Sequence, residues 1–183
     1  FLAESARHSP GKTAVISGEH SLSYGELDAL TDQLAGVLRE QGVAPGDRVG
    51  IYVSKSLASV VSVFSILKAG ACYVPLDPGA PVKRLAYIIQ DSGITTLLTS
   101  AAKVDGVQAM FPEDCPLATV VLVDCDLPAE HRSTRASVPT GVTLVSWNEV
   151  IACPATPLPK NLAIETDTAY ILYTSGSTGT PKG

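Results

Sequence analysis

A glycine-rich segment directly after an apolar run is the feature that most constrains this chain. The apolar run covers residues 169–173, and the ten residues from Thr174 to Gly183 read Thr-Ser-Gly-Ser-Thr-Gly-Thr-Pro-Lys-Gly. Glycines let a backbone turn tightly and approach a ligand closely, and converging loop N–H groups can hold phosphate oxygens. Hydroxyl side chains add short donors, and Lys182 adds a positive charge. The pattern therefore predicts a strand that leads into an anion-binding loop.

The segment differs from two commoner nucleotide-binding loops. A Walker A loop needs a second glycine five positions after the first, followed by Lys and then Ser or Thr. Here Pro181 stands five positions after Gly176, and Gly183 follows Lys182. The spacing G-x-G-x-x-G of a dinucleotide-binding loop does not occur in it either. A flexible Gly/Ser linker is the remaining alternative, but a linker does not follow a buried-type strand or carry Pro-Lys-Gly at fixed offsets.

Strand-like and helix-like patterns alternate along the rest of the chain, and no repeat period is visible. Two capping boxes, Ser23-x-x-Glu26 and Ser146-x-x-Glu149, predict helix starts, and Gly42, Gly70 and Gly93 predict helix ends. The predicted strands are near-continuous apolar or β-branched runs, as in parallel sheets that are covered on both faces; they lie at residues 48–53, 72–74, 95–99, 118–123 and 169–173. We therefore expect an α/β fold with a mostly parallel, helix-covered sheet. Ligands bind at the carboxyl ends of the strands in such sheets.

Composition removes several classes of protein from consideration. The chain has 183 residues, with 45% apolar and 17% charged residues, which is typical of a globular domain and not of a disordered one. Its net charge is −5 and its basic residues are scattered, so we expect no nucleic-acid partner. The longest strongly apolar run, residues 56–67, is too short to span a bilayer. We expect no membrane span and a cytoplasmic location.

The cysteines and histidines predict no metal site. Cysteines stand far apart, without a C-x-x-C pair, which suits reduced and mostly buried thiols better than zinc ligation or a disulfide framework; they are Cys72, Cys115, Cys125 and Cys153. The three histidines, His8, His20 and His131, show no metal-ligand spacing. We assign them to the surface or to packing.

From Ile171 to Lys182 the chain matches, at every position, the AMP-binding signature of the adenylate-forming enzymes. It therefore resembles that superfamily, which holds acyl-CoA ligases, luciferases and the adenylation domains of peptide synthetases. Residues 67–78, with Lys-Ala-Gly early and Pro-Leu-Asp-Pro at the end, resemble a second motif of the family, and residues 22–27 resemble its first. In the second motif we expect Asp77 to hydrogen-bond a turn rather than to act as an acid or base.

The resemblance implies a function for the parent protein, which would be an AMP-forming acid–thiol ligase. Family members use ATP and Mg²⁺ to convert a carboxylic acid into an acyl-adenylate, and pyrophosphate is released. CoA or the phosphopantetheine of an acyl or peptidyl carrier protein then usually accepts the acyl group. The resemblance also assigns the β- and γ-phosphates to seven residues: Thr174, Ser175, Gly176, Ser177, Thr178, Gly179 and Lys182.

The same resemblance implies that much of the enzyme lies outside these residues. We expect residues 1–183 to be a partial N-terminal, AMP-binding domain, without the remainder of the large domain and the small C-terminal domain. The adenine, ribose and acyl contacts and the catalytic residues are expected downstream of Gly183, so no residue here is assigned to catalysis. The fragment alone is expected to be inactive.

The sequence features point to more than one class of carboxylic acid as the substrate. Peptide-synthetase domains usually carry Tyr-Pro after Asp-Pro, whereas this chain has Gly79-Ala80-Pro81. The stretch from Thr99 to Tyr173 also looks longer than in most such domains, and both departures favour an acyl-CoA ligase. The close match of residues 67–78 to the peptide-synthetase form favours an amino-acid adenylation domain instead. A truncated nucleotide-binding module without catalytic activity is the alternative from another class.

Overall fold

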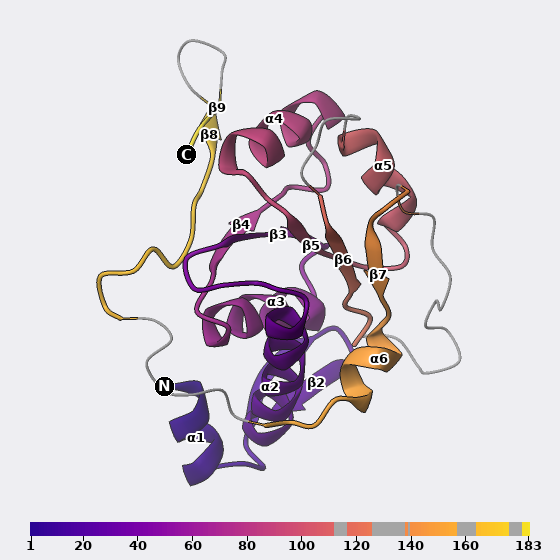
Figure 1. The fold of residues 1–183 in the computed structure, drawn as a ribbon. Coiled ribbons are helices and arrows are strands. Elements are labelled where there is room, and N and C mark those ends of the chain that lie inside the picture. The colour runs from indigo at the N-terminus through magenta and orange to yellow at the C-terminus, as the bar shows by residue number, and fades with distance from the viewer. Residues whose placement is uncertain (112–116, 126–137, 139, 157–163, 176–180) are drawn as a thin grey trace.

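A sheet of five parallel strands forms the centre of the molecule, and helices lie on both of its faces (Figure 1). This computed structural model describes residues 1–111, 117–125, 138, 140–156, 164–175 and 181–183. The strand order is β4-β3-β5-β6-β7, and every neighbouring pair is parallel. The predicted α/β fold with a mostly parallel, helix-covered sheet is confirmed.

The elements follow the alternation that the sequence indicates. The helices are α1 (Leu2–His8), α2 (Tyr24–Glu40), α3 (Leu57–Lys68), α4 (Val82–Ser92), α5 (Val107–Met110) and α6 (Trp147–Ala152), and a 3₁₀ helix, η1 (Val104–Gly106), precedes α5. The strands are β1 (Thr13–Ser17), β2 (His20–Ser23), β3 (Arg48–Tyr52), β4 (Cys72–Pro75), β5 (Thr96–Thr99), β6 (Thr119–Leu122), β7 (Thr143–Val145), β8 (Thr174–Ser175) and β9 (Pro181–Lys182).

Two hydrophobic cores flank the sheet because successive strand residues point to opposite faces. Leu98 and Val121 belong to the core that α2, α3 and α6 cover, whereas Leu97 and Val120 belong to the core under α4 and α5. Every residue of β5 and β6 is buried. This explains why the central strands are apolar or β-branched throughout.

Local sequence signals set the limits of several helices. Both predicted capping boxes form, with Ser23 and Glu26 at the start of α2 and Ser146 and Glu149 at the start of α6. Gly93 ends α4 in the left-handed conformation, with a φ of 64°. Such a φ strains any residue with a Cβ atom, which is why a glycine closes the helix there.

Salt bridges also connect helices α2 and α3. The Nζ atom of Lys68 lies 2.7 Å from Oδ1 of Asp28 and 2.6 Å from Oδ1 of Asp32. Lys68 also donates to the backbone carbonyl of Asp28 at 3.0 Å. The lysine of the second family motif therefore has a structural role between two helices.

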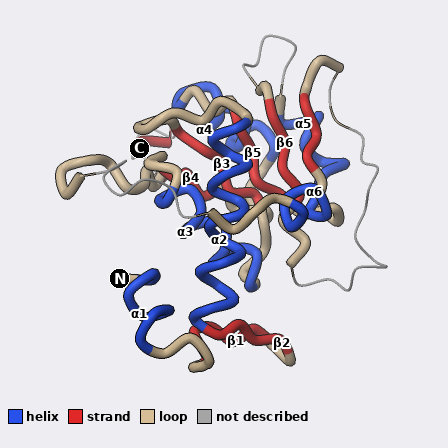
Figure 2. The backbone as a smooth tube through the Cα atoms, turned by 60° about the horizontal axis from the view of Figure 1, so that its bottom comes forward, coloured by secondary structure: helices blue, strands red, loops and turns tan. Residues whose placement is uncertain are grey.

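Some elements were not expected from the sequence. Strands β1 and β2 form an antiparallel hairpin, and Figure 2 shows it with α1 at the beginning of α2, away from the five-stranded sheet. Strand β7 adds a fifth parallel strand beside β6. At three residues, β7 is too short to give a recognisable pattern.

Candidate functional site

The segment that leads to the glycine-rich motif lies beside β4, at one edge of the sheet. The Tyr73 N–H donates to the carbonyl of Ala169 at 3.1 Å, and the Ile171 N–H donates to the carbonyl of Tyr73 at 3.1 Å. Tyr170 thus forms a parallel bridge with Tyr73, and their ring centroids lie 5.4 Å apart.

The strand predicted at residues 169–173 is wrong in extent, because the pairing stops after this bridge. The next hydrogen bond of a parallel ladder would run from the N–H of residue 75 to the carbonyl of Ile171. Residue 75 is a proline and has no N–H to donate. The short pairing still directs the chain toward the carboxyl edge of the sheet, as the sequence predicted.

Beyond the bridge, alternate side chains hold the segment on the molecule. Ile171 and Tyr173 pack against the core under α4 and α5. Tyr170 and Leu172, on the opposite side, are 52% and 56% exposed. The segment is therefore held mainly through the face with Ile171 and Tyr173, and the Tyr170 ring adds its contact with Tyr73 on the other side.

Helix α4 contacts Tyr173 at two points. The Tyr173 hydroxyl donates to Oδ2 of Asp91 at 2.5 Å, and Nη2 of Arg84 donates to the Tyr173 carbonyl at 3.4 Å. Partial burial of the phenol, together with its hydrogen bond to the Asp91 carboxylate, raises the pKa of Tyr173 to about 12. The hydroxyl therefore stays protonated, and a donor to Asp91, up to a higher pH than an ordinary tyrosine.

The first and last residues of the predicted phosphate-binding set come together in an antiparallel hairpin. Thr174 of β8 pairs with Lys182 of β9, and Ser175 pairs with Pro181. Directly opposed residues place their side chains on the same face of a ribbon. The Thr174 hydroxyl also donates to the carbonyl of Lys182, at a long 3.5 Å. A hydroxyl and an exposed ammonium group thus share one face.

Most of the other predicted site residues lie outside the described part of the chain. Ser175 has a described backbone, whereas Gly176, Ser177, Thr178 and Gly179 lie outside the described residues. The structure thus brings Thr174 and Lys182 together and gives no arrangement for the residues between the two strands.

Gly183 lies directly against the ring of Tyr173. A Cβ atom at this position would be 2.7 Å from Cζ of Tyr173 and 2.8 Å from Cγ2 of Ile171. Carbon atoms do not approach so closely, so the contact requires a glycine. The chain therefore returns after Lys182 to the residue from which the hairpin starts.

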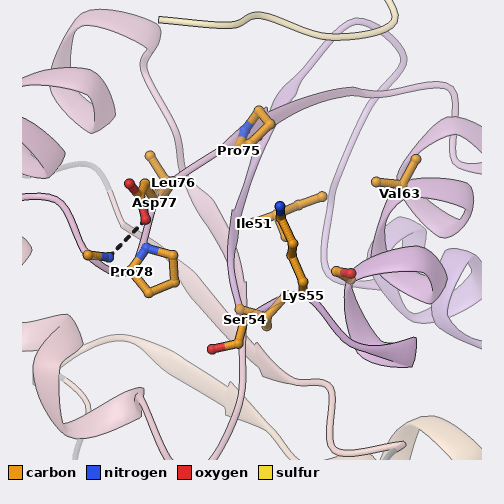
Figure 3. Close-up of a pocket in the computed structure, with 11 residues that line it drawn as sticks. Ile51, Ser54, Lys55, Val63, Pro75, Leu76, Asp77 and Pro78 are labelled. Carbon is orange, nitrogen blue, oxygen red and sulfur yellow. Dashed lines mark hydrogen bonds between the residues drawn. The ribbon is translucent and has the colours of Figure 1, made fainter. Parts of the chain in front are cut away.

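A pocket of about 590 Å³ lies at the carboxyl ends of β3 and β4 (Figure 3). Apolar side chains, among them Ile51, Val63 and Leu76, form much of its wall, and Lys55 and Asp77 are its charged residues. The hairpin and the pocket lie at the same edge of the sheet, because the segment before β8 runs parallel to β4. Open α/β sheets bind their ligands at this edge.

Asp77 has the turn-forming role that we expected. Its Oδ1 atom accepts a hydrogen bond from the N–H of Gly79 at 2.9 Å. This contact fixes the chain between β4 and α4, where it forms one side of the pocket.

The remaining sequence predictions concern metals, thiols and membranes. Within the described ranges, no three His, Cys, Asp or Glu side chains are grouped so that they could hold a metal ion. Cys72 is buried and Cys125 and Cys153 are half-buried, whereas Cys115 and His131 lie outside the described residues. No helix in the described part of the chain combines the length and apolar character that a membrane crossing requires.

Sequence reasoning missed the support that α4 gives to the hairpin. Tyr173 and Asp91 are 82 positions apart, and a single charged residue on a helix carries no signal of its distant partner. Arg84 and Asp91 are seven residues apart and therefore share one face of α4, but this spacing does not indicate which distant residue they contact.

Together, the fold and the site define an α/β protein whose glycine-rich motif begins beyond the carboxyl edge of a parallel sheet. The family model described as AMP-binding enzyme matches residues 2–183, and the chain therefore belongs to that family. This match confirms the family membership that the sequence motifs indicated.

Known proteins resemble the chain along its whole length. Gramicidin S synthase 2 of Brevibacillus brevis is 37% identical over 183 residues, which cover 100% of this chain and 3% of that protein. The nonribosomal peptide synthetase FmoA3, in its α-methyl-L-serine-AMP bound form, matches with a TM-score of 0.72 and 26% identity over 96% of this chain and 16% of its own.

A CoA ligase shares the fold as well. The anthranilate CoA ligase AuaEII, in complex with anthranoyl-AMP, matches with a TM-score of 0.78 and 23% identity, over 100% of this chain and 32% of its own. At this identity the likeness shows the fold alone. The chain spans between 2% and 25% of the length of the first curated relatives that it matches.

Proposed function

We propose that the full-length protein containing this chain activates a carboxylic acid with ATP, and that it forms an acyl-adenylate and releases pyrophosphate. The observation that carries the proposal is the pairing of Thr174 with Lys182 in the hairpin of the AMP-binding motif. A hydroxyl donor and an exposed cation on one face suit the phosphate oxygens of a nucleotide.

In this proposal the acid's carboxylate oxygen attacks the α-phosphorus of ATP, and the bond from that phosphorus to the bridging oxygen of the β-phosphate breaks. Negative charge then grows on the departing pyrophosphate. Lys182 offsets that charge, and the Thr174 hydroxyl, which makes only a long hydrogen bond to the Lys182 carbonyl, would turn from it to donate to the same group. Ser175, Gly176, Ser177, Thr178 and Gly179 complete the phosphate cradle through their hydroxyl and backbone N–H groups.

Magnesium would come with the nucleotide in this scheme. Mg²⁺ commonly binds substrate phosphates together with one or two carboxylates rather than a cage built only of protein. The described residues contain no cluster of three or more His, Cys, Asp or Glu side chains that could hold a metal ion. We therefore assign no residue of this chain to the metal and no step to it.

We propose further that residues 1–183 are part of the N-terminal, AMP-binding domain, and that the catalytic residues lie elsewhere in the full-length protein. The small share of the relatives' length that the chain covers supports this division. In the second half-reaction the acyl group would pass to a thiol, either CoA or the phosphopantetheine of a carrier protein.

An amino acid is the acid that we favour, and a carrier protein is the acceptor. The similarity to a peptide synthetase with a bound aminoacyl-AMP supports this choice over the CoA ligase that the sequence departures favoured. A CoA ligase stays the second candidate because Gly79-Ala80-Pro81 replaces the usual Tyr-Pro of peptide-synthetase domains.

The test is isotope exchange between labelled pyrophosphate and ATP, catalysed by the full-length protein. A panel of amino, aryl and fatty acids should show exchange with a small group of related acids, and we expect amino acids to be that group. Exchange with aryl or fatty acids alone would support the CoA ligase. Absence of exchange across the panel would contradict the proposed function itself.

A further inference from the structure

We propose that Tyr173 is a positioning residue, which sets the places of Thr174 and Lys182 from a fixed point on α4. This inference rests on the proposed function, because it assigns a role in the same reaction. Tyr173 itself does not act on the substrate in this proposal.

The first observation is the anchor on α4. The Tyr173 hydroxyl donates to Asp91 at 2.5 Å, and Asp91 belongs to the last turn of the helix. The apolar face of α4 is buried in the core through Leu85, Ile88 and Ile89. A helix held in this way is a rigid reference for whatever it contacts.

The second observation is that the same helix also holds the backbone of Tyr173. Arg84 donates to the Tyr173 carbonyl at 3.4 Å, and residues seven positions apart on a helix share a face. Arg84 and Asp91 therefore contact the two ends of one residue, its carbonyl and its hydroxyl. This pair of contacts restricts both the direction of the chain and the rotation of the side chain.

The third observation concerns the end of the hairpin. Gly183 packs so closely on the Tyr173 ring that a Cβ atom would lie 2.7 Å from the ring carbon Cζ. Tyr173 precedes Thr174, and Gly183 follows Lys182. Tyr173 thus lies directly before the hairpin, and its ring contacts the residue directly after it. These two connections fix where Thr174 and Lys182 lie.

A catalytic role for the Tyr173 hydroxyl does not fit this arrangement. The hydroxyl proton is donated to Asp91, on the side of α4. The residue is therefore placed to act through Lys182 and Thr174. Small displacements of a charge-stabilising group are costly: about 1 Å can reduce a rate about 100-fold.

The experiment uses the full-length protein and its best acid, with pyrophosphate exchange as the readout. Tyr173→Phe removes only the hydroxyl and should lower kcat about tenfold, with a smaller change in the KM for ATP. Asp91→Ala should have the same effect. The double variant should be no slower than either single variant, because each substitution removes the same Tyr173–Asp91 hydrogen bond. Asp91→Asn keeps an acceptor oxygen and should restore most of the rate.

Tyr87→Phe is the matched control. The Tyr87 hydroxyl also contacts Asp91, at 3.5 Å, but it does not lead to the hairpin. We expect its exchange rate to stay within about twofold of the unmodified protein, as for a surface substitution. A loss as large as that of Tyr173→Phe would overturn the proposal, because it would show a general effect on α4.

Two further measurements separate positioning from other roles. In a Lys182→Ala background, Tyr173→Phe should lower the rate by clearly less than about tenfold, because only Thr174 is left for it to position. Independently of activity, Tyr173→Phe should accelerate hydrogen exchange at the amides of residues 174 and 182 by about tenfold.

Unchanged amide exchange would overturn the positioning role even if the protein proves inactive. Accelerated amide exchange in a protein that exchanges no pyrophosphate would support the anchor and contradict the proposed function alone.

Discussion

Lys182 owes its place to residues on both sides of it. Pro181 and Lys182 form β9, and the backbone pairing sets Lys182 opposite Thr174. The glycine that follows is required by contact with the Tyr173 ring. The glycine that ends Pro-Lys-Gly thus has a local physical reason, apart from any ligand, because a side chain there would clash with the Tyr173 ring.

Lys182→Ala should reduce adenylate formation by the full-length protein about 100-fold, because one charged donor facing the departing pyrophosphate is removed. Lys83→Ala is the matched control, since Lys83 is an exposed lysine on α4. Both variants would be compared by pyrophosphate exchange at saturating acid. An equal rate in Lys182→Ala and the unmodified protein would remove the lysine from the reaction.

Tyr173 gives a prediction about alkaline pH. Its pKa rises from 10.0 to about 12 in the folded protein, so the neutral phenol is favoured by folding. The resulting stabilisation is complete below about pH 10 and is lost as the pH rises toward about 12. Burial also raises the pKa of Tyr73, so ultraviolet titration should show more than one phenolate that forms late, and Tyr173→Phe should remove one of these late components. Loss of an ordinary component instead would contradict the Asp91 contact.

Single residues were predictable from sequence where their partners are near in the chain. Asp77 accepts from Gly79 two positions away, and Ser23 and Glu26 cap each other within one turn. The Tyr173–Asp91 contact was not predictable, because its partners meet only after the sheet and α4 have packed. For the same reason, sequence named Lys182 as a site residue without its support.

At the scale of elements, α4 and the edge of β4 decide where the motif lies. Among the described residues 164–175, only Tyr170 pairs with β4, because Pro75 ends the ladder. Apolar character predicted a strand over residues 169–173, but it carried no information about the partner strand's proline. Helix ends, which depend on local caps, were predicted closely, whereas the β1–β2 hairpin and the short β7 were missed.

The capping box of α6 predicts an effect at acid pH. Hydrogen bonds from the Ser146 hydroxyl and backbone N–H lower the pKa of Glu149. A lowered folded-state pKa stabilises the helix start above the ordinary value of 4.5 and loses this contribution as the pH falls through the folded-state pKa. Glu149→Ala should cost about 1 kcal/mol at neutral pH.

Hydrogen exchange at the Glu149 amide measures this effect. The protection factors of the unmodified protein and Glu149→Ala should differ at pH 7 and converge in acid. Glu149→Gln is the control, because it keeps a cap without a titrating group. A gap between the unmodified protein and Glu149→Ala that does not change with pH would show that the Glu149 charge has no role.

For the molecule as a whole, the sheet order places the hairpin and the pocket at the same edge. Binary patterning predicted the parallel sheet because both of its faces are covered, which leaves runs such as Leu97-Leu98 and Val120-Val121 apolar throughout. Patterning does not encode strand order or the size of a pocket, since these arise from packing between distant segments. ATP was predicted as a substrate from the family motifs and not from the pattern of apolar and polar residues.

The most direct test of the central claim follows the phosphates of ATP in the full-length protein. ATP labelled at its α-phosphate would be incubated with the preferred acid, in the absence of any thiol. We predict pyrophosphate release and a label that co-purifies with the acid as its adenylate. A label recovered in ADP, with the γ-phosphoryl group transferred to the acid as an acyl phosphate, would place the attack at the γ-phosphorus and contradict the proposed reaction.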